Sequence, residues 1–268
     1  MFNRYELAMR AVELYEAQKV GSMFAPLANT TLEKIEIANG DRVLDVACGT
    51  GIVARTIRDQ CGPDVQISGF DINDMMLAKA QALSCDLPGR IDWHVCDVTN
   101  IPTVSDAFSH VFCQQGLQYF PDDRAALAEM HRVLSVNGEL VLTVWGSANE
   151  YFLAQSAAMK KYVSAQASEK ALEPFSYPAT MRVPELLEQL GFKDIKVGTV
   201  TIERVIRDAE TGIREDILGS PLGLMIENIE PSVMDAVVRD IISACIRHLQ
   251  DGDLTIAQKS ALITASAC

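Results

Sequence analysis

The sequence predicts an α/β fold in which a doubly wound, mostly parallel sheet carries helices on both faces. Strand-length apolar runs recur between residues 42 and 145, and helical patterns separate most of them. Those runs are apolar throughout rather than alternating, which is typical of strands covered on both sides. Strand–helix alternation of this kind forms parallel sheets. We expect seven strands, the last of them antiparallel to its neighbour.

The first elements are expected to be helical. Residues 4–20 place apolar side chains at helical spacing, which predicts an amphipathic helix. A second helix is expected to begin near Asn29-Thr30-Thr31, whose side chains can cap it, and to end at Asn39-Gly40.

The strand–helix alternation follows. Asn73 or Asp74 can cap one of its helices, and Pro121-Asp122 can open another. Asn137-Gly138 predicts a turn before an apolar strand. The expected strands are 42–47, 65–71, 91–97, 109–114 and 138–145, and the expected helices are 51–60, 74–84 and 122–134.

The pattern changes after Trp145. We expect a helix at 149–170, a loop at 171–182, a helix at 184–190 and a long strand at 192–206. Residues 208–250 are mainly helical, and after a turn at Asp251-Gly252-Asp253 the run 261–265 can form the final strand. The last two strands therefore bracket a helical insertion.

Composition excludes several classes of partner. A net charge of −13 argues against binding to nucleic-acid backbones or to an anionic membrane surface, both of which need a basic face. No apolar run approaches the length of a membrane span. The seven cysteines are scattered without a Cys-x-x-Cys pair, so we expect no metal site and a reducing, cytoplasmic setting.

Three aspartates lie where strands of the predicted sheet end. Asp45 lies within the end of the first strand, just before the glycine pair Gly49 and Gly51, while Asp71 and Asp97 end the next two strands. A glycine pair lets the backbone approach a ligand closely. An aspartate after the second strand can hold ribose hydroxyls, and one after the third can accept from an adenine amino group. This arrangement predicts a nucleoside site.

Two kinds of nucleoside compete for this site. Gly49–Ala54 also fits the G-x-G-x-x-A pattern of dinucleotide sites, with Asp71 at the expected distance, which keeps an NAD-dependent oxidoreductase open. Asp45, however, would repel a pyrophosphate and attract an ammonium or sulfonium group. With Asp97 as a third carboxylate, the edge favours a cationic nucleoside such as S-adenosylmethionine.

These residues carry a family resemblance. Val43–Gly51, Gly69–Ile72 and Cys96–Val98 resemble the first three motifs of class I S-adenosylmethionine-dependent methyltransferases. Val111–Asp122 resembles the fourth-strand region of their UbiE-like small-molecule branch, and the resemblance spans residues 40–146. It implies a Rossmann-like sheet, S-adenosylmethionine as cofactor and S-adenosylhomocysteine as product.

The resemblance also implies roles for single residues. It places Asp45, Gly49 and Gly51 around the methionine moiety, Asp71 at the ribose, and Gln114 beside the aminocarboxylate. Further residues expected at the cofactor are Asp97 and Val98 at the adenine, with Ala47, Ile72 and Met76 completing the set.

The expected organisation is one compact domain with a lid. Residues 1–40 would form helices over the active site, 41–146 the cofactor-binding core, and 147–268 the remaining strands with a helical lid. The acceptor would be a small, flat and fairly apolar molecule methylated at oxygen, nitrogen or carbon. Candidate lining residues are Phe24, Tyr119, Trp145, Phe175, Tyr177 and Met225.

The sequence offers no evident catalytic base. None of the four histidines (His94, His110, His131 and His248) is expected at the cofactor, and a base is needed only if the acceptor arrives protonated. A protein that binds the cofactor without transferring its methyl group therefore stays open as an alternative. The sequence also leaves the oligomeric state open, a homodimer included.

Overall fold

The structure, a computed structural model, describes residues 4–226 and 229–268. Contacts divide the chain into two compact units. The sheet unit comprises Leu27–Gly146, Pro178–Val200 and Ser260–Cys268, and the helical unit comprises the chain up to Pro26, Ser147–Tyr177 and Thr201–Lys259.

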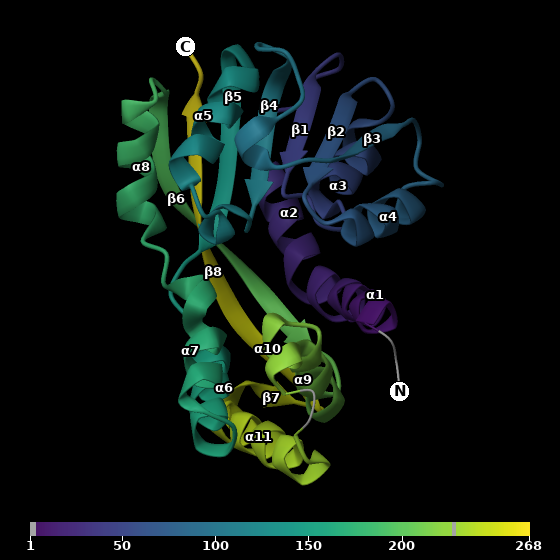
Figure 1. Cartoon of the computed structure of the whole chain (residues 1–268), viewed down its shortest axis with the longest axis vertical. Helices are drawn as coiled ribbons and strands as arrows, with labels where there is room; N and C mark the ends of the chain where they lie inside the picture. The colour runs from purple at the N-terminus through teal and green to yellow at the C-terminus, as the bar shows by residue number, and fades with distance from the viewer. Residues whose placement is uncertain (1–3, 227–228) are drawn as a thin grey trace. The chain divides into compact units, whose positions relative to one another are not determined.

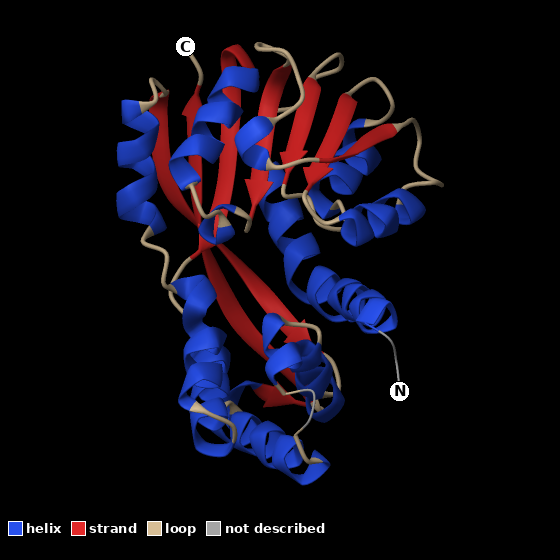
Figure 2. Cartoon of the chain, in the orientation of Figure 1, coloured by secondary structure: helices blue, strands red, loops and turns tan. Residues whose placement is uncertain are grey.

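A parallel sheet forms the centre of the sheet unit (Figures 1 and 2). Its strands pair in the order β3-β2-β1-β4-β5, every one parallel to its neighbour. Their bounds are β1 Arg42–Val46, β2 Gln66–Asp71, β3 Ile91–Val95, β4 Phe108–Gln114 and β5 Leu134–Trp145. The strand order reverses between β1 and β4, and ligands of open α/β sheets bind at such a switch point, outside the carboxyl ends of the strands.

The C-terminal strands complete the sheet. β8 (Asp253–Ser266) pairs antiparallel with β5, and β6 (Lys193–Ile206) lies beyond β8. The expected mostly parallel sheet with antiparallel C-terminal strands is thereby confirmed. A short strand, β7 (Leu249–Gln250), also pairs with β8, so the sheet has eight strands rather than seven.

Helices connect these strands, and their caps follow the sequence. The Asn73 side chain accepts hydrogen bonds from the backbone N–H groups of Met75 and Met76 at the start of α4, and Asp122 accepts from Ala125 in α5. Both caps are as expected. The helices are α2 Ala25–Leu32, α3 Ile52–Cys61, α4 Asp74–Leu83, α5 Asp123–Val133 and α8 Ala179–Gln189, with the short 3-10 turns η2 Val98–Asn100 and η3 Leu117–Tyr119.

Two expectations in this unit are wrong. The second helix does not begin at Asn29: α2 already runs from Ala25 and ends at Leu32, because it buries Leu27, Ala28, Thr31 and Leu32. Asn137-Gly138 does not form a turn before β5 but lies within it. Asn137 adopts a φ of 63°. The strand nevertheless continues, because the Asn137 N–H donates to the Ala267 carbonyl and the Ala267 N–H donates to the Gly138 carbonyl.

The helical unit packs around its own core. The expected first helix is α-helical only at α1 (Arg4–Leu14) and continues as a π-helix, η1 (Tyr15–Phe24). The expected helix at 149–170 is broken at Val163-Ser164, and the expected loop at 171–182 contains a 3-10 turn and the start of α8. The remaining elements are α6 Glu150–Tyr162, α7 Ala165–Leu172, η4 Glu173–Phe175, α9 Ala209–Leu218, α10 Pro221–Met225, α11 Pro231–Ala244 and η5 Ile246–His248.

A buried ionic cluster joins four elements of the helical unit. Asp216 of α9 accepts from Arg204 Nη2 of β6 at 2.7 Å, from Lys19 Nζ of η1 at 2.9 Å and from the Tyr151 hydroxyl of α6 at 2.7 Å. Asp216, Arg204 and Tyr151 are almost inaccessible to solvent. Burial alone would raise the pKa of Asp216, but the charges of Arg204 and Lys19 outweigh it and hold that pKa well below its usual range.

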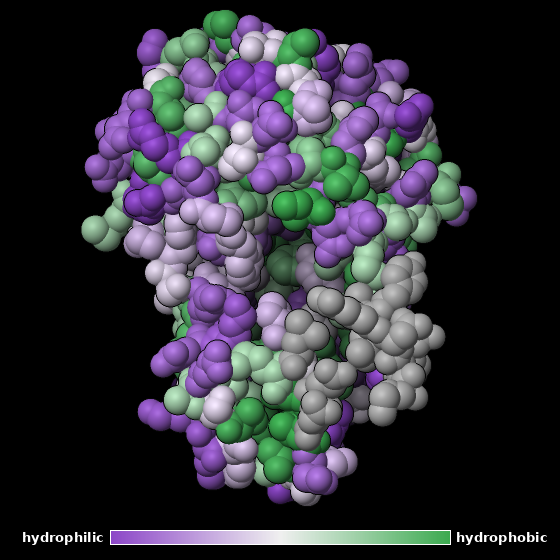
Figure 3. Space-filling model, viewed as in Figure 1, coloured by the Kyte–Doolittle hydropathy of each residue, from purple (hydrophilic) through white to green (hydrophobic). Residues whose placement is uncertain are grey.

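Hydrophilic side chains cover much of the visible surface, with hydrophobic residues between them (Figure 3). Within the described part of the chain, no helix combines the length and apolarity that crossing a bilayer requires.

The ionic cluster yields a stability prediction. Asp216→Asn leaves the buried Arg204 and Lys19 charges without their counterion and should lower the free energy of unfolding by about 3–5 kcal/mol. Asp240→Asn is the matched control, because Asp240 pairs with Lys161 at 2.8 Å where both side chains are largely exposed. Urea unfolding of both variants tests this, and equal losses would contradict a dominant role for the buried cluster.

Candidate functional site

The carboxyl ends of β1, β2 and β3 bring the three predicted aspartates to one edge of the sheet. Asp45 pairs in register with Gly69, near the end of β2, and Asp71 pairs with Val95, the last residue of β3. Asp97 follows two residues later as the N-cap of η2. The topology therefore brings together carboxylates that lie 26 residues apart in the chain at successive strand ends.

The turn after β1 has the backbone geometry that its glycines predict. Gly49 and Gly51 have φ angles of 55° and 77°, in the left-handed region that favours glycine, and Ala47 adopts 53°. The Gly51 N–H donates to the Cys48 carbonyl at 2.8 Å, and Gly51 is the N-cap of α3. The first N–H groups of α3 are thereby presented at this edge.

Trp93 packs beneath this turn. No sequence pattern indicates this position for Trp93. A Cβ atom placed on Gly51 or on Gly69 would lie 2.2 Å from the Trp93 ring, so neither position tolerates a larger residue without rearrangement. The Trp93 indole N–H donates to the Ser84 hydroxyl at 3.2 Å, which holds the ring in place. Two glycines facing one tryptophan on an adjacent strand are visible in the sequence only once the strand register is known.

The Asp71 carboxylate connects two turns at this edge of the sheet. One carboxylate oxygen accepts from the Gly49 N–H and the other from the Asn73 N–H, both at 2.8 Å. The first turn follows β1 and the second leads into α4. A single side chain therefore sets the position of the glycine turn relative to the end of β2.

Asp45 is a buried carboxyl group with a raised pKa. It is 1% exposed and accepts one hydrogen bond, from the Ala54 N–H at 3.1 Å. Burial raises the pKa of Asp45 to about 7, and the negative charge of Asp71 adds to the increase, while the Ala54 N–H opposes it. A cation beside Asp45 would favour the ionised form.

Asp97 lies in a different environment. Its side chain is exposed and accepts from the backbone N–H and the hydroxyl of Thr99, at 2.9 and 2.8 Å, which lowers the pKa of Asp97. It is therefore ionised and preoriented for a donor. Ile72 is 72% exposed beside these carboxylates, and Met76 and Val98 are half-buried.

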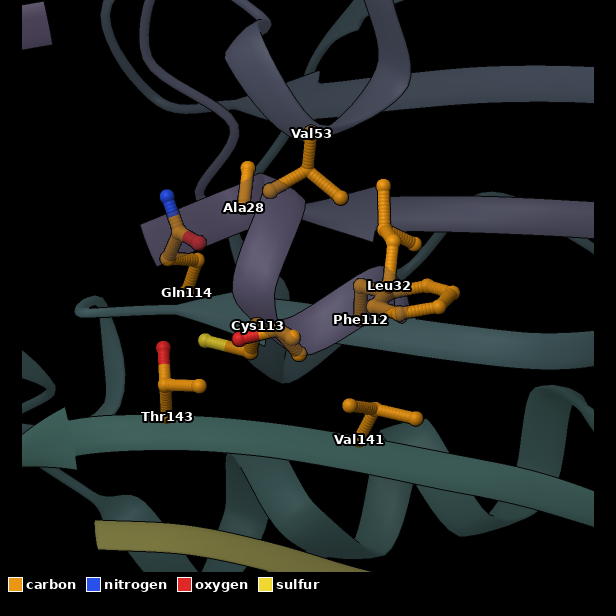
Figure 4. A pocket seen from close by; sticks show the side chains of 9 residues that line it. Ala28, Leu32, Val53, Phe112, Cys113, Gln114, Val141 and Thr143 are labelled. Atoms are coloured by element: carbon orange, nitrogen blue, oxygen red, sulfur yellow. The ribbon is translucent and has the colours of Figure 1, made fainter. Parts of the chain in front are cut away.

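Gln114 ends β4 at the same edge and lines a small cavity (Figure 4). Gln114, Cys113 and Thr143 lie at one end of it, and Leu32, Phe112 and Val141 at the other. Its volume of about 10 Å³ is enough for one water molecule, so this cavity cannot itself enclose a nucleoside.

The predicted acceptor-lining residues belong to both units. In the sheet unit, Tyr119 is 53% exposed on η3 and Trp145 is buried at the end of β5. In the helical unit, Phe175 contacts Phe152 with ring centroids 4.6 Å apart and packs, like Met225, against the buried core. The ring centroids of Phe24 and Tyr15 lie 5.4 Å apart, and Tyr177 is half-buried. Their role toward an acceptor stays a prediction.

The four histidines have contacts of their own. His94 packs edge-on against Phe70, and His131 against Phe192, where burial lowers the pKa of His131. His110 contacts the Ser109 hydroxyl at 3.1 Å, and His248 contacts Glu150 at 2.8 Å. Among the described residues, no group of three or more His, Cys, Asp or Glu side chains could hold a metal ion.

Comparison with known families bears on this edge directly. The family described as "Methyltransferase domain" matches residues 43–138, the stretch from β1 to the first half of β5. Residues 43–138 are therefore similar to this family. The match includes Asp45, Asp71, Asp97, the glycine turn and Gln114.

Similar proteins extend the comparison. The chain is 34% identical over 113 residues to the ubiquinone/menaquinone biosynthesis C-methyltransferase UbiE of Geotalea daltonii, covering 41% of this chain and 48% of that protein. The chain thus spans about half the length of this curated relative.

Solved structures share the fold of this chain. Haemonchus contortus phosphoethanolamine N-methyltransferase 2, in complex with S-adenosyl-L-methionine, aligns with a TM-score of 0.61 at 19% identity, over 96% of this chain and 56% of that one. The [4+2]-cyclase SpnF aligns with a TM-score of 0.57 at 20% identity, over 91% of this chain and 80% of that one.

The raised pKa of Asp45 predicts a pH-dependent stability difference. A buried acid whose pKa is higher in the folded state, about 7 against 3.8, loses stability as pH rises between these values and no further above them. Asp45→Asn keeps a carbonyl oxygen for the Ala54 N–H but cannot ionise. It should match the wild type near pH 4 and exceed its free energy of unfolding by up to about 4 kcal/mol at pH 8. Urea unfolding at both pH values measures this; a constant difference would contradict it.

Proposed function

We propose that this protein is an S-adenosylmethionine-dependent methyltransferase acting on a small molecule. The observation that carries this proposal is the set of three carboxylates around a glycine turn, at one edge of a sheet whose residues 43–138 are similar to a methyltransferase family. A relative named as a C-methyltransferase and a structural neighbour in complex with S-adenosyl-L-methionine support it.

The edge fits this cofactor better than a dinucleotide. Three acidic side chains oppose a pyrophosphate but favour an ammonium and a sulfonium. The left-handed turn at Ala47, Gly49 and Gly51 lets the backbone approach a ligand, and the exposed Ile72 offers an apolar surface for a base. We assign the methionine end to Asp45 and Gln114, the ribose to Asp71, and the adenine to Asp97 with Ile72, Met76 and Val98.

When bound, S-adenosylmethionine supplies a methyl group on a positively charged sulfur, which an acceptor nucleophile displaces in line. The task of the chain is then to align the acceptor and exclude water. Ionised Asp45 would offset the positive charge of the bound ligand, and its pKa near 7 makes ligand binding at neutral pH coupled to loss of a proton. We assign no catalytic base.

The acceptor is proposed to be a small apolar or aromatic molecule in the cytoplasm. Acceptors of this kind suit the aromatic and methionine side chains predicted to line the pocket. The net charge of −13 favours neither a nucleic acid nor an anionic membrane as partner.

A second function, cofactor binding without methyl transfer, remains a specific alternative. The fold of SpnF resembles that of this chain, and that protein is named as a [4+2]-cyclase, so this fold hosts other reactions. Formation of S-adenosylhomocysteine together with a methylated product would support methyl transfer. Cofactor binding with no such product over a broad panel of phenols, amines and quinols would favour the alternative.

The assignment of Asp97 predicts a selective loss of affinity. Asp97→Ala should weaken S-adenosylmethionine binding at least about tenfold, because the donor on the ligand loses its charged acceptor. Asp92→Ala is the matched control, since Asp92 lies near the opposite end of β3 and pairs with Arg90. Calorimetric titration of both variants tests this; near wild-type affinity in Asp97→Ala would refute the adenine assignment.

A further inference from the structure

The turn that follows β4 contains two glutamines whose side-chain oxygens are buried. Gln115 continues the β4–β5 ladder, since its N–H donates to the Thr143 carbonyl at 2.8 Å, but its φ angle is 57°. A left-handed conformation is uncommon for a residue other than glycine and costs energy, and such residues cluster at functional sites. Gln118 follows in η3, one turn further along the chain.

This turn packs directly against the predicted cofactor turn. A Cβ atom placed on Gly116 would lie 2.8 Å from the Ala47 Cβ, so only glycine permits this approach. β4 is also the neighbour of β1 in the sheet, with Asp45 paired to Phe112. The glutamines therefore lie at the same carboxyl edge as the glycine turn, within the sheet unit.

The hydrogen bond of the Gln118 side chain determines which atom of its amide can bind a further partner. Its Nε2 donates to the Gln115 carbonyl at 2.8 Å, and because a carbonyl can only accept, the nitrogen must face it. The Oε1 atom is then turned away. This oxygen is buried and accepts no hydrogen bond from the residues that the structure describes.

Gln115 differs, because its side-chain amide faces a hydroxyl, which can donate as well as accept and so does not determine which end of the amide faces it. Its Nε2 lies 2.9 Å from the Ser260 hydroxyl of β8, which fixes the side chain, and the residue is 6% exposed. Its Oε1 is likewise buried and accepts nothing within the described part of the chain. Buried polar atoms in proteins are nearly always hydrogen-bonded, so the orphaned Gln118 oxygen calls for a donor that the described residues do not supply.

We propose that the side-chain oxygen of Gln118 accepts a hydrogen bond from a hydroxyl or amino group of the methyl acceptor. This inference rests on the proposed function and narrows its substrate class to molecules that carry an O–H or N–H at or beside the methylated atom. An amide oxygen accepts a hydrogen bond but does not remove a proton at neutral pH. Gln118 therefore orients the acceptor and selects for a protic group, without acting as a base.

Such a site discriminates strongly. A binding site with buried acceptors rejects an analogue that lacks the donor, because its polar atoms are then left unpaired. We expect wild-type protein, saturated with S-adenosylhomocysteine, to bind 1-naphthol at least about tenfold more tightly than 1-methylnaphthalene, which has a methyl group in place of the hydroxyl.

Two substitutions at Gln118 test the role of its oxygen. Gln118→Met and Gln118→Glu both lose the nitrogen that donates to the Gln115 carbonyl, but only Gln118→Glu keeps an acceptor oxygen. Gln118→Met should lose the preference for 1-naphthol, whereas Gln118→Glu should retain it. Naphthalene fluorescence measures both probes, and thermal unfolding checks that the variants fold.

Each outcome decides between the proposals. Equal affinity of wild type for the two probes, including no binding of either, would overturn the inference about Gln118. A loss of S-adenosylhomocysteine affinity in Gln118→Met, measured by calorimetry, would also overturn it and assign the amide to the cofactor. Failure of the wild type to bind S-adenosylhomocysteine at all would instead contradict the proposed function.

Discussion

The candidate site depends on the two hydrogen bonds that the Asp71 carboxylate accepts. One comes from Gly49 in the turn after β1, and the other from Asn73 in the turn before α4. Because the same carboxylate holds both turns, the glycine turn and the end of β2 form one rigid surface. Asn73 in turn caps α4 through Met75 and Met76, so the helix is connected to that surface.

Two opposite electrostatic environments flank this carboxylate. Asp45 is buried, and its pKa is raised to about 7, while Asp97 is exposed and its pKa is lowered by the N–H and hydroxyl of Thr99. The edge therefore combines Asp45, which a nearby cation would help to ionise, with Asp97, which is already ionised. This division suits a ligand with a positive end and a neutral, hydrogen-bonding end, as proposed for S-adenosylmethionine.

Much of the sheet unit follows from local sequence. The strands of residues 42–114 are predicted within a few residues, because each is a short apolar run between turn residues. The caps Asn73 and Asp122 are predicted because their side chains act on the next turn of backbone. The shared edge of Asp45, Asp71 and Asp97 also follows, since parallel strands end on the same side.

Features that depend on tertiary contacts could not be predicted. Trp93 beneath Gly51 and Gly69 requires the register of β2 and β3. The Asp216 cluster joins residues almost two hundred positions apart, and no local pattern marks Lys19 as its partner. Asn137-Gly138 is a strong turn signal that β5 overrides, because both residues bond to Ala267. The orphaned oxygen of Gln118 became evident only from its surroundings.

The edge formed by Asp45, Asp71 and Asp97 is proposed to bind a cationic nucleoside. Calorimetric titration of the wild-type protein at pH 8 with S-adenosylmethionine and, separately, with NAD⁺ tests it most directly, because the two ligands share adenosine but differ in charge. We expect saturable binding of S-adenosylmethionine with one site per chain and no measurable binding of NAD⁺. Binding of NAD⁺ with equal or greater affinity would contradict it.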